Sequence, residues 1–170
     1  GLLEPTEGTV LLNGRDIKSY SRVAISSKLA YVPPVVSLQL YMSAVDFILT
    51  ASLGIVGIMG SPGPNERARA NSVLKELNVE HLAERNIATL SGGEMRVVAL
   101  ARALYQAPTC ILDEVYAPLD ISAVLRVKRN IQDSVDRGNL MIYTTHDIQT
   151  AQSPDKVLLV YQDGTVELRP

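Results

Sequence analysis

Residues 109–114 read TCILDE, a short, mainly apolar run that is followed by two adjacent acids. Helical patterns lie on either side of this run, at Glu94–Tyr105 and Asp120–Asp136, and a second apolar run follows at Leu140–Tyr143. Short apolar strands that alternate with amphipathic helices are typical of a largely parallel sheet that is covered on both faces. The sequence therefore predicts an α/β fold with a mainly parallel sheet.

The strand pattern continues toward both ends of the chain. Further strands are expected at Thr9–Leu12, Leu29–Val32, Val157–Tyr161 and Val166–Leu168, and a helical turn is expected at Ile148–Ala151. The composition indicates that these elements form one compact domain, because 170 residues with 46% hydrophobic content are enough for a single core. A formal net charge of -2 gives no general attraction to nucleic acid, so no nucleic-acid partner is expected.

The middle of the chain differs from the rest because it carries almost no charge. Ser43 and Asn65 could each cap a helix there, and Asp46 is the only charged residue from position 29 to position 65. A surface so poor in charge is buried either in the fold or under a partner, and both alternatives stay open. The apolar part, residues 47–60, would rise about 21 Å as a helix, less than the roughly 30 Å hydrocarbon core of a bilayer. No membrane span is therefore expected.

The stretch Ser91-Gly92-Gly93-Glu94 begins the first of the two long helices. A serine followed three residues later by glutamate is the pattern of a capping box, in which the two side chains satisfy free backbone N–H groups. The two glycines also leave room for an anionic ligand at the helix N-terminus, where the helix dipole favours negative charge. The two interpretations are compatible.

Three side chains that could bind a ligand or take part in catalysis follow the predicted strands. Asp113 and Glu114 come directly after one strand, and His146 comes shortly after the next. Ligands of parallel α/β sheets bind outside the carboxyl ends of the strands, so these residues could converge on one ligand. One acid could hold Mg²⁺ while the other activates a water molecule; the structural alternative is a strand that ends in solvent. Asp120 is expected to cap the next helix.

Cys110 is the only cysteine of the chain. A single cysteine excludes an intrachain disulfide and a multi-cysteine metal site. Its place inside an apolar strand predicts a buried, small hydrophobic side chain.

In this order, the motifs resemble the nucleotide-binding domain of ABC transporters. Residues 90–94 (LSGGE) are similar to the signature motif of that family, and residues 111–114 (ILDE) to Walker B with its catalytic glutamate. Residues 118–120 (PLD) are similar to the D-loop, and residues 145–147 (THD) to the motif of the switch histidine. The opening ten residues resemble the stretch that follows the P-loop helix of the family.

Two further stretches point to a subgroup. Gly14–Ile17 and Tyr31–Pro33 resemble ATPases of importers for metal chelates of the iron–siderophore or cobalamin type. The resemblance implies a P-loop NTPase-like (ABC ATPase) core at residues 1–34 and 89–170, with an inserted helical subdomain at residues 35–88. It also implies that residues 1–170 are one partial domain whose N-terminal part is missing.

The family implies a role for each matching residue. Asp113 would position Mg²⁺, Glu114 would polarise the attacking water, and His146 would contact the γ-phosphate of ATP. Asp120 would lie at the interface between two ATPase domains. The expected activity is ATP hydrolysis coupled to transmembrane import of a metal chelate, with ATP and Mg²⁺ as cofactors.

The signature motif implies partners. Two such domains, identical or different, enclose two ATP molecules head to tail, so Ser91, Gly92 and Gly93 would contact the nucleotide of the opposite protomer. The charge-poor middle would carry the face that docks a transmembrane permease subunit. The expected location is therefore cytoplasmic, peripheral on the inner face of the cell membrane.

The sequence also departs from the family at three places. The P-loop pattern G-x-x-x-x-G-K-[ST] is absent, Pro34 stands where the family has the Q-loop glutamine, and Val115-Tyr116 replaces the usual Pro-Thr or Pro-Ser. These departures argue against ATP hydrolysis by this chain alone. The missing P-loop and Pro34 motivate one alternative, a non-catalytic module that serves the ATP site of a partner. A soluble ABC ATPase without a transport role is a more distant alternative, and the near-neutral charge weighs against it.

Overall fold

The computed structural model describes residues 3–34, 40–52, 62–116, 119–147 and 154–169. Its centre is a parallel three-stranded sheet in the order β3-β4-β5, formed by Leu29–Val32, Thr109–Leu112 and Leu140–Tyr143. Leu29 pairs with Thr109 and Thr109 with Leu140, so the three strands start level and end level. The predicted bounds of these three strands are confirmed, as is the parallel sheet.

Helices cover one face of this sheet. Helix α5 (Gly92–Gln106) contacts β3 and β4, while α6 (Ile121–Asp136) contacts β5 and α5. Ala30 and Cys110 point toward these helices and are fully buried, which confirms the expected burial of the cysteine.

On the opposite face of the sheet, large apolar side chains remain exposed among the described residues. Tyr31 is 53%, Leu140 56% and Ile142 48% exposed. The prediction of a sheet covered on both faces is therefore wrong for the part of the chain that the structure describes. The reason is that α5 and α6 pack against each other and so share one face.

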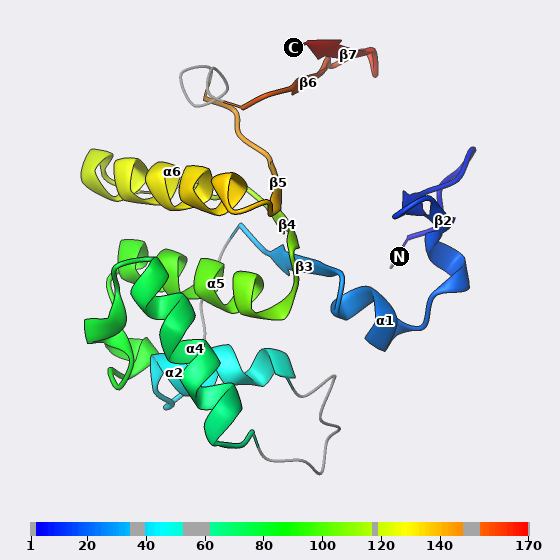
Figure 1. The fold of residues 1–170 in the computed structure, drawn as a ribbon. Helices are drawn as coiled ribbons and strands as arrows, with labels where there is room; N and C mark the ends of the chain where they lie inside the picture. Colours follow the sequence, from blue (N-terminus) through cyan, green and yellow to red (C-terminus); the bar gives the residue numbers. More distant parts are fainter. Residues whose placement is uncertain (1–2, 35–39, 53–61, 117–118, 148–153, 170) are drawn as a thin grey trace.

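The helices below the sheet form a tight cluster around α5. Helices α2 (Ala44–Leu49) and α4 (Pro64–Glu76) pack against α5 and against each other, and α6 lies on the other side of α5 (Figure 1). This places the largest part of the core, including the fully buried Ile48, Leu74 and Leu100, inside the helical cluster.

The caps of these helices test two predictions. Ser43 caps α2, because its hydroxyl accepts the backbone N–H of Asp46 at 3.2 Å. Asn65 was expected to cap the next helix, but the cap is Gly63, two residues earlier, and α4 begins at Pro64. Proline suits the first helical position because its backbone angle is already helical and the N–H it lacks would be unpaired there. That preference fixes the start of α4.

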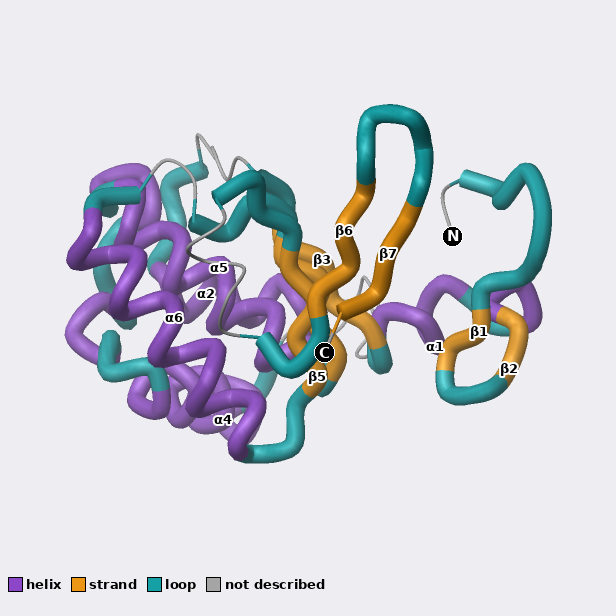
Figure 2. The backbone as a smooth tube through the Cα atoms, turned by 90° about the horizontal axis from the view of Figure 1, so that it is seen from above, coloured by secondary structure: helices purple, strands orange, loops and turns teal. Residues whose placement is uncertain are grey.

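Two hairpins lie outside this body (Figure 2). Strands β1 (Leu11–Leu12) and β2 (Arg15–Asp16) form the first, shorter than the strand predicted at Thr9–Leu12, with Asn13 and Gly14 at positive φ in its turn. Strands β6 (Val157–Val160) and β7 (Val166–Arg169) form the second.

The remaining described elements are short. They are α1 (Arg22–Ser26) and the 3-10 helices Ile17–Ser19, Thr50–Ser52, Glu80–Leu82 and Ile87–Thr89. The helical turn predicted at Ile148–Ala151 lies outside the described residues, as do Ala117 and Pro118. In the described ranges, every helix is too short or too polar to cross a bilayer.

Candidate functional site

The carboxyl ends of β3, β4 and β5 bring the predicted acids together with residues from both neighbouring strands. The backbone N–H of Asp113 donates to the carbonyl of Val32 at 2.9 Å, and that of Thr144 donates to the carbonyl of Leu112 at 3.0 Å. The parallel ladder thus continues past the ends of the strands. It holds Asp113 and Thr144 side by side at the edge where parallel sheets bind their ligands.

The carboxylate of Asp113 accepts a hydrogen bond on each oxygen. Thr144 donates its hydroxyl proton to Oδ1 at 2.6 Å, and Tyr31 donates its phenol proton to Oδ2 at 3.0 Å. The bond from Thr144, and next the bond from Tyr31, lowers the pKa of the Asp113 carboxyl. The same bond to Asp113 raises the pKa of the Tyr31 phenol. Asp113 therefore stands as an ionised, oriented carboxylate.

Glu114 and His146 converge on one hollow, as the sequence predicts. Oε1 of Glu114 lies 4.0 Å from Nδ1 of His146, and both line a pocket of about 190 Å³. Its other lining residues are Tyr116, Leu119, Val124, Thr145 and Asp147. The two side chains are 49% and 79% exposed, so both can reach a ligand from solvent.

The backbone of Glu114 is held in an unusual conformation. Its φ is 44°, in the left-handed region that side chains other than glycine rarely adopt. Its N–H donates to the hydroxyl oxygen of Thr144 at 2.9 Å, which fixes the turn. Strain of this kind is concentrated at functional sites, where the surrounding structure stabilises it.

The start of α5 forms the predicted capping box. The Ser91 hydroxyl accepts the backbone N–H of Glu94 at 3.3 Å, and the Glu94 carboxylate accepts the N–H of Ser91 at 2.8 Å. Arg85 donates to the same carboxylate at 2.8 Å. The bond from the Ser91 backbone is the main reason that the pKa of Glu94 is lowered. These hydrogen bonds share no residue with those of Asp113 and Glu114. The predicted site residues therefore form two separate groups, one at the start of α5 and one at the carboxyl ends of the strands.

The two glycines of this motif differ in their surroundings. A Cβ atom added to Gly92 would meet nothing within 4 Å, whereas one on Gly93 would lie 3.1 Å from the Cβ of Ala123. Gly93 is therefore needed for the close approach of α6, while Gly92 leaves open space beside the helix N-terminus. The anion site at Ser91–Gly93 stays a prediction.

Asp120 caps α6 as expected. Its Oδ1 accepts the backbone N–H of Ala123 at 2.9 Å and the hydroxyl proton of Ser122 at 2.7 Å. The bond from Ser122, followed by the one from Ala123, lowers the pKa of Asp120. Its place at an interface is not tested by these contacts.

Sequence reasoning missed Arg96, a buried arginine on α5. Its side chain is 5% exposed, and it donates to the carbonyl oxygen of Pro33 at 2.9 Å and to that of Pro34. The segment after β3 is thus held to α5 through its backbone, independently of the side chain at position 34. An arginine in an otherwise apolar stretch of helix was the only signal for this contact.

Asp113 suits a magnesium ion that is bound mainly by other groups. No cluster of three or more histidine, cysteine or acidic side chains occurs in the described ranges, so a cage made by the protein alone is absent there. Mg²⁺ commonly takes one or two carboxylates and keeps water and phosphate oxygens as its other ligands. One ionised carboxylate at the edge of the sheet fits that pattern.

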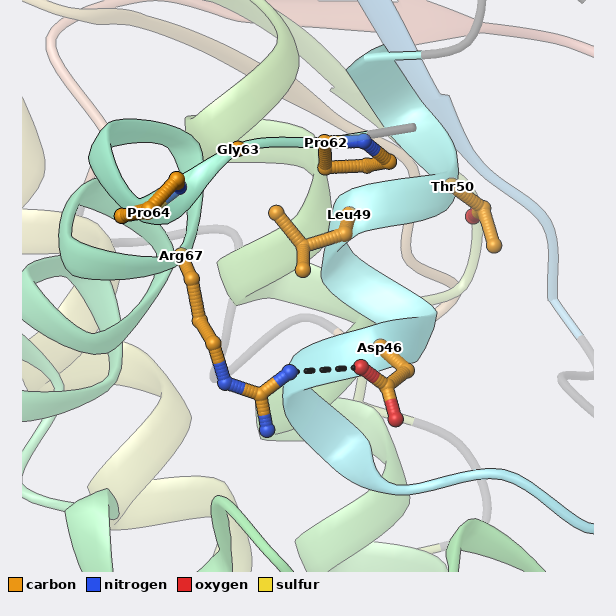
Figure 3. A pocket seen from close by; sticks show the side chains of 7 residues that line it. All are labelled: Asp46, Leu49, Thr50, Pro62, Gly63, Pro64 and Arg67. Atoms are coloured by element: carbon orange, nitrogen blue, oxygen red, sulfur yellow. Dashed lines mark hydrogen bonds and ion pairs between the residues drawn. The ribbon is translucent and has the colours of Figure 1, made fainter. Parts of the chain in front are cut away.

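A second hollow lies between α2 and α4. Asp46, Leu49, Thr50, Pro62, Gly63, Pro64 and Arg67 line a pocket of about 530 Å³ (Figure 3). Arg67 lies at one edge of this pocket, donating to Asp46 at 2.8 Å and to Glu84 at 3.0 Å. The hydroxyl of Ser43, and to a smaller degree Arg67, lowers the pKa of Asp46. The pocket is therefore apolar on its sides, with an ordered ion pair at its edge.

Comparison with known proteins assigns the family. The family model described as "ABC transporter" matches residues 1–117. This chain belongs to the ABC transporter family.

Individual relatives give the same result. The chain is 34% identical to the "Cobalamin import ATP-binding protein BtuD" of Halobacterium salinarum, over 98% of the chain and 42% of that protein. It is 32% identical to the "Zinc transport system ATP-binding protein TroB" of Treponema pallidum, over 94% of the chain and 60% of that protein. The chain thus spans about half the length of these relatives.

A solved structure confirms the fold. The dimeric, ADP- and phosphate-bound post-hydrolysis state of the ATP-binding cassette MJ0796 matches with a TM-score of 0.74 and 25% identity. The match covers 92% of this chain and 70% of that one. The chain therefore has the fold of an ABC ATPase, a P-loop NTPase-like α/β fold.

Proposed function

We propose that this chain is part of the ATP-hydrolysing subunit of an ABC importer and that its cargo is a metal chelate. The observation that carries the proposal is the convergence of Glu114 and His146 on one pocket at the carboxyl ends of the parallel strands, beside the oriented carboxylate of Asp113, in a chain of this family. The cargo rests on the names of the relatives, one of which is a cobalamin importer subunit and another a zinc transport subunit.

The geometry suggests how these residues share the reaction. Glu114 is ionisable, half exposed and fixed at its backbone, so its carboxylate can orient or deprotonate a water molecule that attacks the γ-phosphate. His146, 4.0 Å away, can donate a hydrogen bond to that phosphate. Asp113 would hold Mg²⁺, which neutralises phosphate charge during phosphoryl transfer.

The remaining predicted residues would act between two domains. Ser91, Gly92 and Gly93 would contact the nucleotide of a second ATPase domain, because free N–H groups and the dipole of α5 favour a phosphate there. The open space beside Gly92 supports this role. Asp120, at the exposed start of α6, would lie at the interface of the two domains.

The helical part of the chain would dock the permease subunit. We assign residues 35–88 to a helical subdomain and residues 1–34 and 89–170 to the catalytic core, within one domain. The pocket between α2 and α4 lies in the helical part, and its apolar walls suit an inserted side chain of a partner (Figure 3). The subunit would then sit on the cytoplasmic face of the membrane, with no nucleic acid as a partner.

The decisive experiment uses the complete protein with its permease in lipid vesicles. Glu114→Gln is expected to abolish ATP hydrolysis, by about 100-fold or more, while ATP binding persists, because the carboxylate acts on water and not on the nucleotide. Glu7→Gln, at an exposed position outside the helical subdomain that would dock the permease, is the matched control and should leave hydrolysis unchanged. Hydrolysis that survives Glu114→Gln would refute the catalytic assignment.

Pro34 supports one alternative, a non-catalytic module that serves the ATP site of a partner. Its ring carries no group that could bind a metal or water, and its carbonyl is already bound by Arg96. The same assay separates the two: a non-catalytic module would bind nucleotide without hydrolysis in the wild type. A soluble ABC ATPase would instead hydrolyse ATP without any dependence on vesicles or permease.

A further inference from the structure

Tyr31, Asp113 and Thr144 lie on one face of the sheet at its carboxyl edge. Tyr31 pairs with Ile111 and Ile111 with Ile142, so these three residues are level across the strands. Because side chains alternate along a strand, Asp113 and Thr144, two residues further on, follow the direction of Ile111 and Ile142. The three polar groups therefore meet on the face of the sheet that α5 and α6 leave open.

Each oxygen of the Asp113 carboxylate is held by a different strand. Thr144, after β5, donates to Oδ1 at 2.6 Å, and Tyr31, on β3, donates to Oδ2 at 3.0 Å. One hydrogen bond already restricts rotation of a carboxylate about its last bond, and a second bond to the other oxygen, from a different strand, fixes the orientation of its plane. An ionised carboxylate oxygen has two lone pairs, so each keeps one site for a cation or its bound water.

Thr144 makes a second contact with the same hydroxyl group. Its oxygen accepts the N–H of Glu114 at 2.9 Å while its proton is donated to Asp113. A hydroxyl has one proton and two lone pairs, so both bonds coexist. One side chain thereby joins the orientation of the Asp113 carboxylate to the backbone turn that places Glu114.

We propose that Thr144 and Tyr31 are positioning residues, which orient the Asp113 carboxylate for a divalent cation, and that Thr144 ties this orientation to Glu114. The inference rests on the proposed assignment of Asp113 to Mg²⁺. Hydrogen-bond partners behind a metal ligand fix its geometry, and their removal typically lowers metal affinity about 10- to 100-fold. We expect loss of either hydroxyl to lower the affinity of Asp113 for the cation by a factor of this order. The effect acts through the Asp113 carboxylate and requires no contact of Thr144 or Tyr31 with the nucleotide.

The test uses Mn²⁺ alone as the probe, on the 170-residue chain. Paramagnetic broadening of backbone amide signals at Asp113 and Glu114 in two-dimensional NMR spectra reports site-specific binding without ATP. Thr144→Val, which removes the hydroxyl and keeps the shape, should raise the Mn²⁺ midpoint about 10-fold or more. Thr144→Ser, which keeps the hydroxyl, should restore it to within about threefold of the wild type.

Tyr31→Phe tests the second oxygen and guards against misfolding. Tyr31 is 53% exposed, so loss of its hydroxyl does not disturb the core. Tyr31→Phe should also raise the midpoint of the Mn²⁺ titration several-fold. Its matched control is Tyr161→Phe, which removes a phenol–carboxylate bond of 2.9 Å to Glu167 in the β6–β7 hairpin and should change nothing at Asp113.

A second signal separates positioning from a general loss of structure. The amide of Glu114 loses its acceptor in Thr144→Val and keeps it in Thr144→Ser, so its chemical shift should move in the first variant only. Unchanged midpoints in both Thr144→Val and Tyr31→Phe would overturn the proposal, as would a wild type without Mn²⁺ broadening at Asp113. Failure of ATP hydrolysis in the complete protein would leave this test unaffected, because the probe is the metal alone.

Discussion

Gly93 of α5 lies so close to Ala123 of α6 that a Cβ atom on the glycine would come within 3.1 Å of the alanine Cβ. Ala123 is 2% exposed and sits in the first turn of a helix capped by Asp120, so it has little freedom to move. The glycine therefore sets the distance between the starts of two helices. The residues of the predicted interface, Ser91 and Asp120, are the caps of these same helices.

Alanine at the two glycines should have opposite effects on stability. In a helix, alanine is favoured over glycine by up to about 1 kcal/mol, so Gly92→Ala, which meets open space, should raise or preserve the free energy of unfolding. Gly93→Ala must displace Ala123, and overpacking costs about 1–3 kcal/mol, so a net loss of about 1 kcal/mol is expected. Urea denaturation of both variants measures the difference. If Gly93→Ala were as stable as Gly92→Ala, α6 would be able to move away from position 93 without a loss of free energy of unfolding.

Glu94 should make the stability of the chain depend on pH. The Ser91 backbone bond lowers the folded-state pKa of Glu94 below its ordinary value of 4.5. A carboxyl with a lowered folded pKa stabilises the protein above its ordinary pKa and loses that contribution as the pH falls through the folded value. Charge at a helix N-terminus contributes about 0.3–1 kcal/mol. The deficit of Glu94→Gln in free energy of unfolding should therefore be fully present well above pH 4.5 and shrink as the pH falls below that value.

The exposed acid Glu7 offers the control for this titration. Glu7 lies exposed in the N-terminal segment, away from the α5 helix N-terminus, so Glu7→Gln serves as the matched acid-to-amide variant. A Glu94→Gln deficit that stays constant over the whole range would show that packing, and not charge, accounts for the role of Glu94.

Local signals predicted the parts of the site that local structure determines. The apolar run at 109–112 predicted β4, and the caps Ser43, Ser91 and Asp120 predicted the starts of three helices, because each depends on residues within a few positions. The convergence of Glu114 and His146 followed from the general rule that ligands bind at the carboxyl ends of parallel strands.

Contacts across the sheet could not be predicted in the same way. Tyr31 is 82 residues from Asp113 and Thr144 is 31 residues away, so their bonds depend on strand order and register, which periodicity does not give. The same limit applies to Arg96, whose partner Pro33 lies 63 positions earlier in the chain. The apolar strands predicted helices on both faces of the sheet, which is wrong for the described residues. Periodicity does not show which face a helix occupies; that depends on the packing of α5 on α6.

Tyr116 stands where the family usually has threonine or serine, and its side chain is part of the core. Its side chain is 8% exposed and its ring meets that of Tyr143 edge-on, with centroids 5.5 Å apart. Burial is the main cause that raises the pKa of its phenol. Tyr116→Ser, which restores the usual residue type, should lower the free energy of unfolding by about 3 kcal/mol, since removal of a buried aromatic ring costs about 3–5 kcal/mol.

The matched variant Tyr116→Phe keeps the ring and should cost less than about 1 kcal/mol, because its volume is conserved. Thermal or urea unfolding distinguishes the two. A Tyr116→Ser variant as stable as the wild type would mean that the site collapses around the smaller residue.

Cys110 should report on unfolding of the whole sheet. Its thiol is fully buried on β4, donates to the carbonyl of Ala107 at 3.6 Å, and has a pKa raised by burial to about 12. Only the thiolate reacts with disulfide reagents, so the native thiol is both shielded and protonated. Labelling at about pH 8 should therefore proceed only from the unfolded fraction, about 10⁻³ or less, and be slower than that of an exposed cysteine by the same factor. The exposed control is Thr6→Cys in a Cys110→Ala background, which should react within the mixing time.

If urea accelerates the labelling of Cys110 along the same curve that describes loss of helical signal, sheet and helical cluster unfold together. Rapid labelling of the native wild type would instead show that β4 opens on its own, and with it the edge that carries Asp113 and Glu114.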